Sequence, residues 1–525
     1  MSDLSLPRSS ARLRVRWWPL ILIAVAVAGW LAWVGISPEI HRQDRVMKTI
    51  AGGLSGIVLV LLWLVALSRL PWRHRLGGVL LVAVLLGLAA ALFRIDGVTG
   101  DLLPRLVPRW ARGSTQTVAP ANAPEVELPS GFPGFPQFLG PSRDGIIPGP
   151  ALARDWKSPA PELLWRVPVG ESYAGIAIAG ARAISIEQRG ANETVVCRNL
   201  FTGATLWMHE DAARYENPLG GIGPRAMPTI AGERVFAVGA TGHLRCLSLA
   251  DGSLQWQRDL LRDASATLPE WGVAGSPLIV GDVVVVHPGG NGHSLAAYQI
   301  ATGEPAWAGG EARAGYSSPQ FVTLLGEPQF LIFNHDGVAG HGATDGRVLW
   351  SYAWTKAAQH VTDPRAVGPD RFVVSAGYGS GADLVTLSRD AEGAWQTTRV
   401  WHTQRLKSKF ASVVVRDGFL YGLDDGRLTC IDLATGQPRW TGERIGHGQL
   451  LLAGDLLVAT AENGDIILLE AVPDVARELG RFSALRGKMW NPPALAPPFL
   501  LVRNQTEAAC YRLPLAQPEA GKSAP

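Results

Sequence analysis

A short pattern, a tight turn that ends in Gly followed four residues later by Trp, recurs through the chain after residue 200. The copies are Thr202-Gly203 with Trp207, Asp251-Gly252 with Trp256, Thr302-Gly303 with Trp307, Asp345-Gly346 with Trp350, Thr435-Gly436 with Trp440, and a looser one, Glu392-Gly393 with Trp401. Successive Trp residues are 49, 51, 43, 51 and 39 residues apart. Repeats of this size are single supersecondary units that bury a core only by packing on their neighbours.

The composition of each copy predicts β-structure. Asp-Gly and Thr-Gly favour hairpin turns, because Gly adopts the positive φ that such turns require. The segments before the turns, such as HLRCLSL from His243 and RLTCIDL from Arg427, alternate apolar and polar residues as half-buried strands do. We expect each Trp to pack between neighbouring units, with its N–H reaching a backbone carbonyl there.

A second series, of segments that begin the first strand of each unit, gives the number of units. The eight candidates are YAGIAI from Tyr173, RAMPTI from Arg225, VAGSPLI from Val273, YSSPQFV from Tyr316, HVTDPRAV from His360, KFASVVV from Lys409, HGQLLLA from His447 and KMWNPPAL from Lys488. There are fewer complete turn motifs than strand starts, so the last sheet needs a strand from the N-terminal side, such as ELLWRVPV (Glu162–Val169). The two series predict an all-β, eight-bladed β-propeller over residues 136–513, preceded by transmembrane helices.

The four cysteines follow the same repeat. Cys197, Cys246 and Cys430 each stand ten residues before a repeat Trp, and Cys510 lies at the matching place in the last unit. Equivalent positions in different units lie in separate cores, whereas a disulfide needs Cα atoms within about 7 Å. None of the cysteines has the spacing of a zinc or haem ligand. Buried free thiols are therefore expected, and no metal site is predicted.

The first hundred residues are far more apolar than the rest, which explains a mean hydropathy of +0.12 for the whole chain. Residues 17–36, 50–68 and 76–93 form three apolar runs, each close to the ~20 residues that cross a bilayer as a helix. A cleaved signal peptide is the competing interpretation of the first run. Two further runs, and Trp18, Trp30 and Trp33 in the first, favour three retained helices.

Basic residues orient this anchor. Arg8, Arg12, Arg14 and Arg16 precede the first run, and Arg69, Arg73 and Arg75 lie between the second and third. The N-terminus is therefore expected in the cytoplasm and the propeller in the periplasm, on a bacterial inner membrane. We divide the chain into an anchor (1–96), a Pro/Ala/Gly-rich linker (97–135), the propeller (136–513) and a disordered tail (514–525). A net charge of +3 argues against a nucleic-acid partner.

The units VVCRNLFTGATLW, LRCLSLADGSLQW and LTCIDLATGQPRW resemble the tryptophan-docking repeat of PQQ-like β-propellers, from about Phe135 to Leu513. That family includes quinoprotein alcohol and glucose dehydrogenases and the outer-membrane-protein assembly lipoprotein. FPQFLGPSRDGI (Phe135–Ile146) is similar to the opening of many PQQ-like propeller proteins. The resemblance implies the fold and makes PQQ the cofactor to consider. The chain lacks the adjacent cysteine pair of quinoprotein alcohol dehydrogenases, and no set of Ca²⁺-binding oxygens can be picked out.

The loops that lead into the innermost strands of a propeller line its central funnel, so the strand starts name the candidate ligand-binding residues. These are Tyr173, Arg225, Trp271, Tyr316, His360, Lys409, His447, Lys488 and Trp490. Cations and aromatic rings suit a flat, anionic ligand, which includes PQQ but also many small anions and acidic peptide segments. Structural roles remain open: Trp271 and Trp490 as wall packing, and Arg225 as a donor to backbone carbonyls. His360 and His447 are isolated and do not form a metal site.

Two functions are therefore compatible with the sequence. The first is a non-catalytic binding or assembly module, anchored in the membrane, with a periplasmic protein or an anionic small ligand as its partner. The alternative is a PQQ-dependent quinoprotein oxidoreductase that oxidises an alcohol or sugar and passes electrons to membrane quinone. No nucleophile or catalytic residue can be named from residue order. The sequence leaves the ligand, the bound cofactor, the partner and the oligomeric state open.

Overall fold

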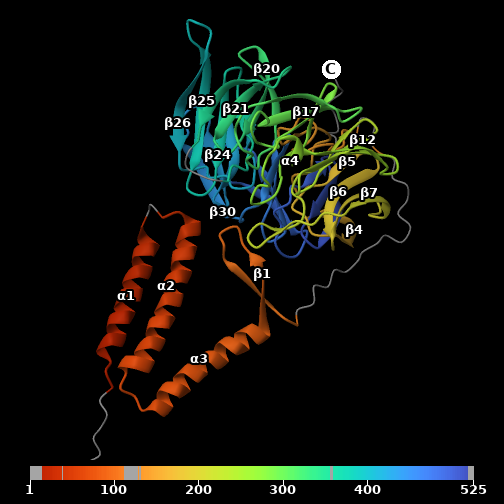
Figure 1. Cartoon of the computed structure of the whole chain (residues 1–525). Coiled ribbons are helices and arrows are strands. Elements are labelled where there is room, and N and C mark those ends of the chain that lie inside the picture. The colour runs from red at the N-terminus through yellow and green to blue at the C-terminus, as the bar shows by residue number, and fades with distance from the viewer. Residues whose placement is uncertain (1–14, 38–39, 111–127, 129–131, 355–358, 518–525) are drawn as a thin grey trace, which may run out of the picture. The chain divides into compact units, whose positions relative to one another are not determined.

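A computed structural model describes residues 15–37, 40–110, 128, 132–354 and 359–517 of the chain (Figure 1). The chain divides into two compact units, Met1–Gly113 and Ser114–Pro525, and each is described by itself. The described residues contain three helices that are long and apolar enough to cross a membrane. The predicted apolar helices and the mainly β character of the remainder are both confirmed.

In the first unit the helices are α1 (Trp18–Ile36), α2 (Arg42–Leu62), which continues as one π-helical segment η1 (Trp63–Leu67), and α3 (Trp72–Leu92). Helix α2 begins eight residues before the predicted apolar run, because its first turn is polar and is capped by His41, which accepts a hydrogen bond from the Asp44 N–H. Helix α3 begins directly after Pro71, a residue that suits a helix start. Hydropathy finds the apolar middle of a span and misses such polar first turns.

Small residues let α1 and α2 approach closely. At Gly56 a Cβ atom would lie 3.1 Å from Val27, and at Gly52 it would lie 2.6 Å from the Trp30 ring. The Trp30 indole N–H in turn donates to the Lys48 carbonyl at 3.1 Å. Glycines four residues apart on one helix face are typical of tight packing between membrane helices.

The linker expected at 97–135 is ordered at both of its ends. Strands β1 (Phe93–Val98) and β2 (Pro104–Pro108) form an antiparallel hairpin directly after α3. At the other end Phe135 makes an antiparallel bridge with Ile178. Most of the linker, residues 111–127 and 129–131, lies outside the described residues. Of the expected tail, Leu515 bridges Leu152, and residues 518–525 are outside the description.

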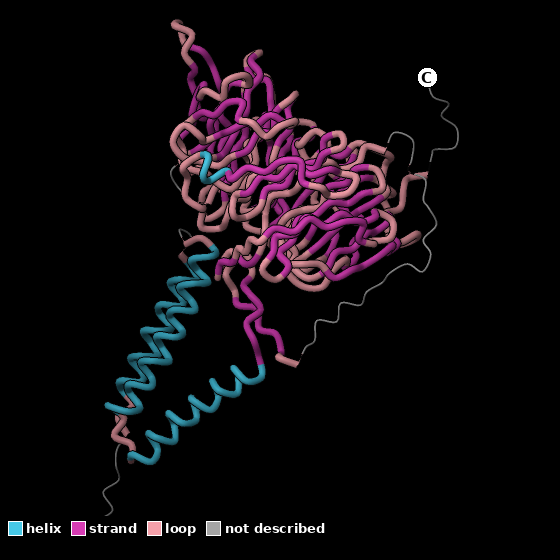
Figure 2. Tube along the Cα trace, turned by 45° about the vertical axis from the view of Figure 1, so that its right-hand side comes forward, coloured by secondary structure: helices cyan, strands magenta, loops and turns pink. Residues whose placement is uncertain are grey.

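Strands and loops make up nearly all of the described part of the second unit (Figure 2). It contains eight sheets of four or five strands, numbered here in chain order. Sheet 1 is β5–β8 (Ala177–Ala179, Arg182–Arg189, Asn192–Asn199, Thr205–Asp211), sheet 2 is β11–β14 (Thr229–Ala231, Arg234–Val238, His243–Ser248, Leu254–Asp259), sheet 3 is β15–β18 (Leu278–Val280, Val283–Val286, Leu295–Gln299, Pro305–Gly309) and sheet 4 is β19–β22 (Gln320–Leu324, Glu327–Phe333, Gly337–Gly342, Val348–Ala353). Sheet 5 is β23–β26 (Arg365–Ala366, Arg371–Ala376, Gly381–Arg389, Trp395–Thr403), sheet 6 is β27–β30 (Val414–Arg416, Phe419–Asp424, Arg427–Asp432, Pro438–Arg444), sheet 7 is β31–β34 (Gln449–Ala453, Leu456–Thr460, Asp465–Glu470, Glu478–Ser483) with β3 (Ile146–Ile147), and sheet 8 is β35–β37 (Ala494–Ala496, Phe499–Arg503, Glu507–Arg512) with β4 (Glu162–Pro168). The short hairpin β9–β10 (Glu216–Asn217, Gly221–Ile222) and helix α4 (Leu260–Asp263) lie in loops.

Sheet 8 is completed by the strand that the sequence predicted. Strand β4, from the N-terminal side, pairs antiparallel with β37, and Trp165 stands opposite Cys510. The same opposition occurs inside other sheets, where Cys197 faces Trp207 and Cys246 faces Trp256. All four cysteines are free and buried, as expected. Burial raises the pKa of Cys197 and of Cys246 to about 11, so both thiols are protonated at neutral pH.

Five Trp rings pack on the Gly turn of the following sheet: Trp165, Trp207, Trp256, Trp307 and Trp401. The Trp165 ring lies 2.7 Å from where a Cβ of Gly203 would be, and Trp256 has the same relation to Gly303. The indole N–H groups donate to backbone carbonyls in the next sheet: Trp165 to Leu200, Trp207 to Leu249, Trp256 to Ile300, Trp401 to Leu433 and Trp440 to Val472. Any side chain at these glycines would displace the ring.

Two sheets depart from this pattern. The Trp350 indole donates within its own sheet, to Gln329 Oε1 at 2.7 Å, and its ring stacks on Phe372 of sheet 5. Sheet 7 has Gly480 at the position of the repeat Trp, and the Trp156 side chain from the N-terminal side packs there, 3.3 Å from where a Cβ would lie. Trp156 lies outside the repeats, so the periodicity could not reveal that it replaces the missing ring.

Candidate functional site at the strand starts

The segments that lead into the first strands, here called the strand starts, are joined from sheet to sheet by hydrogen bonds. Four of the eight bonds run from a backbone N–H of one sheet to a side-chain oxygen of the next, as from Ser276 N–H to Ser318 Oγ at 3.0 Å. The series is Tyr173 N–H to Pro224 O, Met227 N–H to Ser276 Oγ, Ser276 N–H to Ser318 Oγ, Ser318 N–H to Asp363 Oδ1, Asp363 N–H to Ser412 Oγ, Gln449 Nε2 to both Phe410 O and Trp490 O, and Asn491 Nδ2 to Ser172 O. Each sheet is thus bonded to the next, and sheet 8 to sheet 1.

The N-terminal segment Phe132–Ile147 contacts the first strands of sheets 1, 2, 5, 6 and 7 and the segments that lead into those of sheets 3 and 4. Phe135 bridges Ile178 of sheet 1, and the Pro136 carbonyl accepts from the Ile230 N–H of sheet 2. At its other end Ile146 and Ile147 pair in parallel with β31 of sheet 7. The segment therefore joins first strands that are far apart in the sequence. The sequence marked these residues only by their resemblance to a family opening.

Arg143 is the centre of this segment. Its side chain is only 3% exposed and donates to three backbone carbonyls, those of Ser276, Pro277 and Pro319. These carbonyls belong to the strand starts of sheets 3 and 4. The Arg143 carbonyl accepts from Arg365 Nη1 of sheet 5 at 3.1 Å. One residue therefore connects three consecutive sheets.

Asp363 is the buried carboxyl group near Arg143 and Arg365. It is 3% exposed and accepts hydrogen bonds from Ser318 N–H and from Gln320 Nε2. Burial raises the pKa of Asp363, against the opposite effect of the Ser318 N–H and of Arg143. Burial likewise lowers the pKa of Arg143 to about 10, which leaves it charged at neutral pH. Asp363 and the two arginines thus form a buried group of ionisable side chains at the strand starts.

Four of the nine predicted ligand-binding residues form one cluster. Tyr173 stacks on Trp490 with ring centroids 5.6 Å apart, and Lys488 Nζ lies 4.0 Å from the Trp490 centroid. Lys488 Nζ also donates to the Tyr173 hydroxyl at 3.2 Å. The Arg225 guanidinium lies 5.4 Å from the Tyr173 ring and 4.7 Å from the Tyr215 ring. Cation–π contacts of this kind link sheets 8, 1 and 2.

Arg225 itself holds a loop. Its guanidinium donates to the carbonyls of Gly220, Gly221 and Gly223, in the loop that carries strand β10. Among the described residues no carboxylate forms an ion pair with it, and burial lowers its pKa. The alternative role foreseen for Arg225, donation to backbone carbonyls, is present, although the carbonyls belong to its own loop.

Two more predicted residues, Lys409 and His447, are linked to this cluster through Phe410. Trp490 also packs on Phe410, at 4.9 Å, and Phe410 meets His447 at 5.8 Å. Lys409, which precedes Phe410, lies 4.4 Å from the Tyr378 ring. Glu462 joins the group, since it accepts from the Trp490 indole at 3.0 Å and from the His447 backbone N–H at 3.1 Å.

Trp271 and Tyr316 form a second stacked pair, with centroids 5.1 Å apart. The Trp271 backbone N–H donates to the Tyr316 hydroxyl at 3.3 Å. His360 contributes to this side through its backbone, because its carbonyl accepts from the Tyr316 N–H at 2.7 Å. The His360 imidazole is buried, stacks on Phe333 at 4.0 Å and bonds the Asn334 carbonyl. It thus faces the core of sheet 4.

Tyr215, Tyr378, Phe410 and Glu462 contact the predicted residues but escaped the sequence prediction. Phe410 was within reach, because it directly follows Lys409 in a strand-start segment. Tyr215, Tyr378 and Glu462 lie in the loops that follow β8, β24 and β32. No periodic sequence pattern marks these loops. The described residues contain no group of three or more His, Cys, Asp or Glu that could hold a metal ion.

Comparison with known proteins gives the class of this fold. Residues 158–328 match the family model of the outer membrane protein assembly factor BamB. No curated protein matches the sequence. Among solved structures, a europium-containing methanol dehydrogenase is similar at 11% identity and TM-score 0.54, over 72% of this chain and 98% of that one. The quinohemoprotein alcohol dehydrogenase from Comamonas testosteroni is similar at 11% identity and TM-score 0.54, over 74% and 82%.

BamB from Moraxella catarrhalis is similar at 15% identity and TM-score 0.49, over 69% of this chain and 100% of that one. Identities of 11% to the two dehydrogenases show a common fold and do not carry their activities to this chain. Together with the family model, they confirm the resemblance to PQQ-like β-propeller proteins that the repeats indicated.

The first prediction concerns Arg143. Arg143→Ala leaves three buried carbonyls without their donor and removes a positive charge near Asp363, so we expect a loss of about 3–5 kcal/mol in unfolding free energy. The measurement is denaturant unfolding of the full chain in detergent, followed by Trp fluorescence. Arg154→Ala is the matched control, because Arg154 is half-exposed and its ion pairs should contribute at most about 1 kcal/mol. Equal effects of the two substitutions would contradict the role of Arg143.

The second prediction concerns His287, which supports the loop before Tyr316. Its Nδ1 bonds the Ser294 carbonyl, and its Nε2 accepts from the Gly315 N–H at 2.9 Å, so the ring is held neutral. Burial lowers the pKa of His287 to about 4, below the ~6.5 of an unfolded chain. The unfolded state therefore binds the extra proton. Stability from His287 is complete above pH ~6.5 and falls as the pH drops toward 4, by about 3 kcal/mol.

His287→Gln should flatten this part of the stability curve, whereas His293→Gln in the neighbouring loop should leave it unchanged. The check is the unfolding free energy at several pH values between 4 and 7 for the three proteins. Parallel curves for wild type and His287→Gln would show that other groups cause the acid sensitivity.

Proposed function

We propose that the chain is a membrane-anchored, eight-bladed β-propeller that works as a non-catalytic binding module. In this proposal the eight sheets are the blades, and the ring is closed by β4 in sheet 8. Its support is the continuous series of hydrogen bonds between strand starts, which returns from Asn491 in sheet 8 to Ser172 in sheet 1. The proposed propeller covers residues 136–513, with a linker before it and the anchor at 1–96.

The proposed location is the periplasmic face of a bacterial inner membrane. Support comes from the basic residues Arg69, Arg73 and Arg75 around the start of α3, which favour the cytoplasmic side. With the α2–α3 turn in the cytoplasm, the chain leaves α3 on the opposite side. Arg8, Arg12 and Arg14, before α1, lie outside the described residues, so they support this orientation by sequence alone.

The strand starts are the proposed binding surface, and the partner is an anionic small ligand or an acidic segment of a periplasmic protein. The observation that carries this is the cluster of Arg225, Lys409 and Lys488 among aromatic rings. Arg225 and Lys488 are partly exposed and can attract a carboxylate directly, whereas Lys409 is buried and adds positive charge behind them. Tyr173, Arg225, Trp271, Tyr316, Lys488 and Trp490 all keep part of their surface exposed.

The alternative, a quinoprotein oxidoreductase, has its support in the shared fold with two dehydrogenases. A planar cofactor needs an aromatic face on which to stack. Trp490 is packed by Tyr173, Phe410 and Lys488, and Trp271 is stacked on Tyr316. Because these rings already pack on one another, a binding module is the better supported function.

The third prediction tests the site with the full chain in nanodiscs and two fluorescent decapeptides, one rich in Glu and Asp and one rich in Lys. The acidic peptide should bind, more weakly at high salt, and the basic peptide should not. Lys409→Gln with Lys488→Gln should weaken the binding at least about tenfold, which is a loss of ~1.4 kcal/mol. Lys157→Gln with Arg154→Gln is the control, because these exposed cations lie outside the strand starts.

The same preparation separates the two functions. Incubation with PQQ and Ca²⁺, removal of excess cofactor, and a dye-linked assay on alcohols and sugars should give neither retained PQQ nor turnover. Stoichiometric retention with turnover would overturn the non-catalytic proposal. Equal binding of both peptides would overturn the anion site.

The fourth prediction concerns topology. An alkaline phosphatase fused after Pro525 should be active, because this enzyme folds only in the oxidising periplasm, and a fusion in the α2–α3 turn after Leu70 should be inactive. Whole-cell phosphatase activity, normalised to the amount of fusion protein, is the measurement. The reverse pattern would place the sheets in the cytoplasm.

A further inference from the structure

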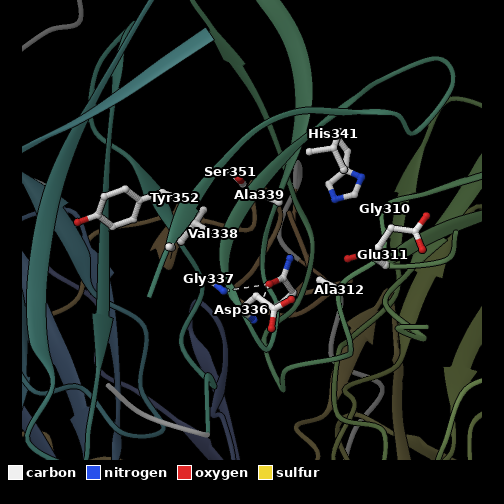
Figure 3. A pocket seen from close by; sticks show the side chains of 14 residues that line it. Gly310, Glu311, Ala312, Asp336, Gly337, Val338, Ala339, His341, Ser351 and Tyr352 are labelled. Carbon is white, nitrogen blue, oxygen red and sulfur yellow. Dashed lines mark hydrogen bonds between the residues drawn. The ribbon is translucent and has the colours of Figure 1, made fainter. Parts of the chain in front are cut away.

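A pocket of about 200 Å³ lies between sheets 3 and 4 (Figure 3). On the side of sheet 3 it is lined by Ser294 and by the segment Gly310–Ala312. On the side of sheet 4 it is lined by residues of β21 and β22, among them His341 and Tyr352. None of the nine strand-start candidates is among its described lining residues, so it is a separate feature from the proposed binding surface.

His341 places one unsatisfied hydrogen-bond acceptor at the pocket. Its side chain is fully buried, and Nδ1 donates to the Gly346 carbonyl at 2.8 Å. That bond fixes the neutral tautomer, in which Nε2 carries a lone pair, and Nε2 has no partner among the described residues. Burial lowers the pKa of His341, so the ring stays neutral at physiological pH. A buried acceptor without a donor is costly unless a bound molecule supplies one.

Ser294 supplies a second group of this kind. Its hydroxyl is buried and has no hydrogen-bond partner among the described residues. Gly310 keeps the two groups close to each other, since a Cβ there would lie 2.8 Å from both His341 Cε1 and Ser294 Cβ. The missing side chain leaves open the space that these two polar groups share.

Two carboxylates lie at the exposed side, or mouth, of the pocket. Glu311 and Asp336 are both exposed lining residues, and neither forms an ion pair with Lys or Arg in the described part of the chain. Glu311 accepts from the Gly292 N–H, and Asp336 contacts His335, which also meets Arg313. Figure 3 shows Glu311 and Asp336 beside the labelled strand residues. Two carboxylates favour a cation at this place.

The rest of the lining is mixed. Ser351 and Asn334 are polar, and Asn334 Oδ1 accepts from the Asp336 and Gly337 N–H groups, whereas the other side chains are apolar or turned away. Val338, Ala339, Val348 and Ala353 present carbon atoms to the pocket. The Tyr352 hydroxyl points elsewhere, since it donates to Asp383 Oδ2 of sheet 5 at 2.5 Å. The site thus combines an inner acceptor, an outer pair of carboxylates and an aliphatic path between them.

We infer that this pocket binds a small aliphatic ammonium compound, such as a diamine or an amino alcohol. An N–H or O–H of the ligand donates to His341 Nε2 and meets the Ser294 hydroxyl. An ammonium group lies near Glu311 and Asp336, and the carbon chain contacts the valine and alanine side chains. Anionic ligands are excluded, because the two carboxylates would repel them and His341 offers no donor.

The fifth prediction uses 1,4-diaminobutane as the probe and the full chain in detergent. Calorimetry should show saturable 1:1 binding, and ethanolamine should bind more weakly. The uncharged 1,4-butanediol should bind at least about tenfold more weakly than the diamine, and acetate should not bind. Tm should rise with diamine concentration, since a ligand that binds only the folded state stabilises it.

Substitutions assign the binding to the pocket. Glu311→Gln with Asp336→Asn should weaken diamine binding at least about fivefold, while the control Glu304→Gln, an exposed carboxylate of sheet 3 outside the pocket, should not. Ser294→Val should fill the inner space and abolish binding. His341→Phe should also abolish binding, but it removes the hydrogen bond to the Gly346 carbonyl and with it a support of that turn. Ser294→Val and the Glu311→Gln, Asp336→Asn double variant leave this bond intact, so they test the pocket independently of folding of the His341 variant.

Three results would overturn the inference. One is the absence of saturable diamine binding, which would leave the pocket with ordered water only. Another is equal binding of diamine and diol, which would remove the role of the carboxylates. The last is undiminished binding in Ser294→Val and in the mouth double variant, which would place the diamine elsewhere on the chain.

Discussion

The contact between an indole ring and the bare backbone of a Gly turn is the interaction on which the second unit depends. A four-stranded sheet has too little apolar surface to be stable alone, so each one needs its neighbours. Trp165 on Gly203 and Trp256 on Gly303 supply this contact at the fourth strands of their sheets. At the first strands the neighbours are joined by backbone N–H groups and by Ser, Asp, Gln and Asn side chains. Neighbouring sheets are therefore held together both at their first strands and at their fourth strands.

Much of this was accessible from the sequence. Periodic turn motifs gave the sheets, the strand starts gave the ligand-binding candidates, and the count of incomplete units predicted the role of Trp165. The features that escaped prediction are non-periodic. Trp156 fills a place that Gly480 leaves empty, and Arg143 binds carbonyls more than 130 residues away. Single residues with distant partners leave no local pattern, and the polar pocket around His341 belongs to the same class.

The strand starts combine rigidity with charge. Arg225 is held by three carbonyls, and the Tyr173–Trp490 and Trp271–Tyr316 pairs fix four large rings. Such a surface can bind without much loss of side-chain entropy, because the side chains are already ordered. In the proposed function these ordered aromatic and cationic groups recognise an anionic partner.

The pairing of β4 with β37 has a consequence for the order in which the protein folds. Strand β4 is synthesised more than 300 residues before its partner, and the Phe132–Ile147 segment must likewise wait for β31. During translation these early strands have exposed, unpaired edges, and such edges promote wrong pairing. The sheets between them have local contacts and can form in sequence, but the last docking step joins the two ends of the unit. Folding should therefore finish slowly and only after chain release, as high contact order implies.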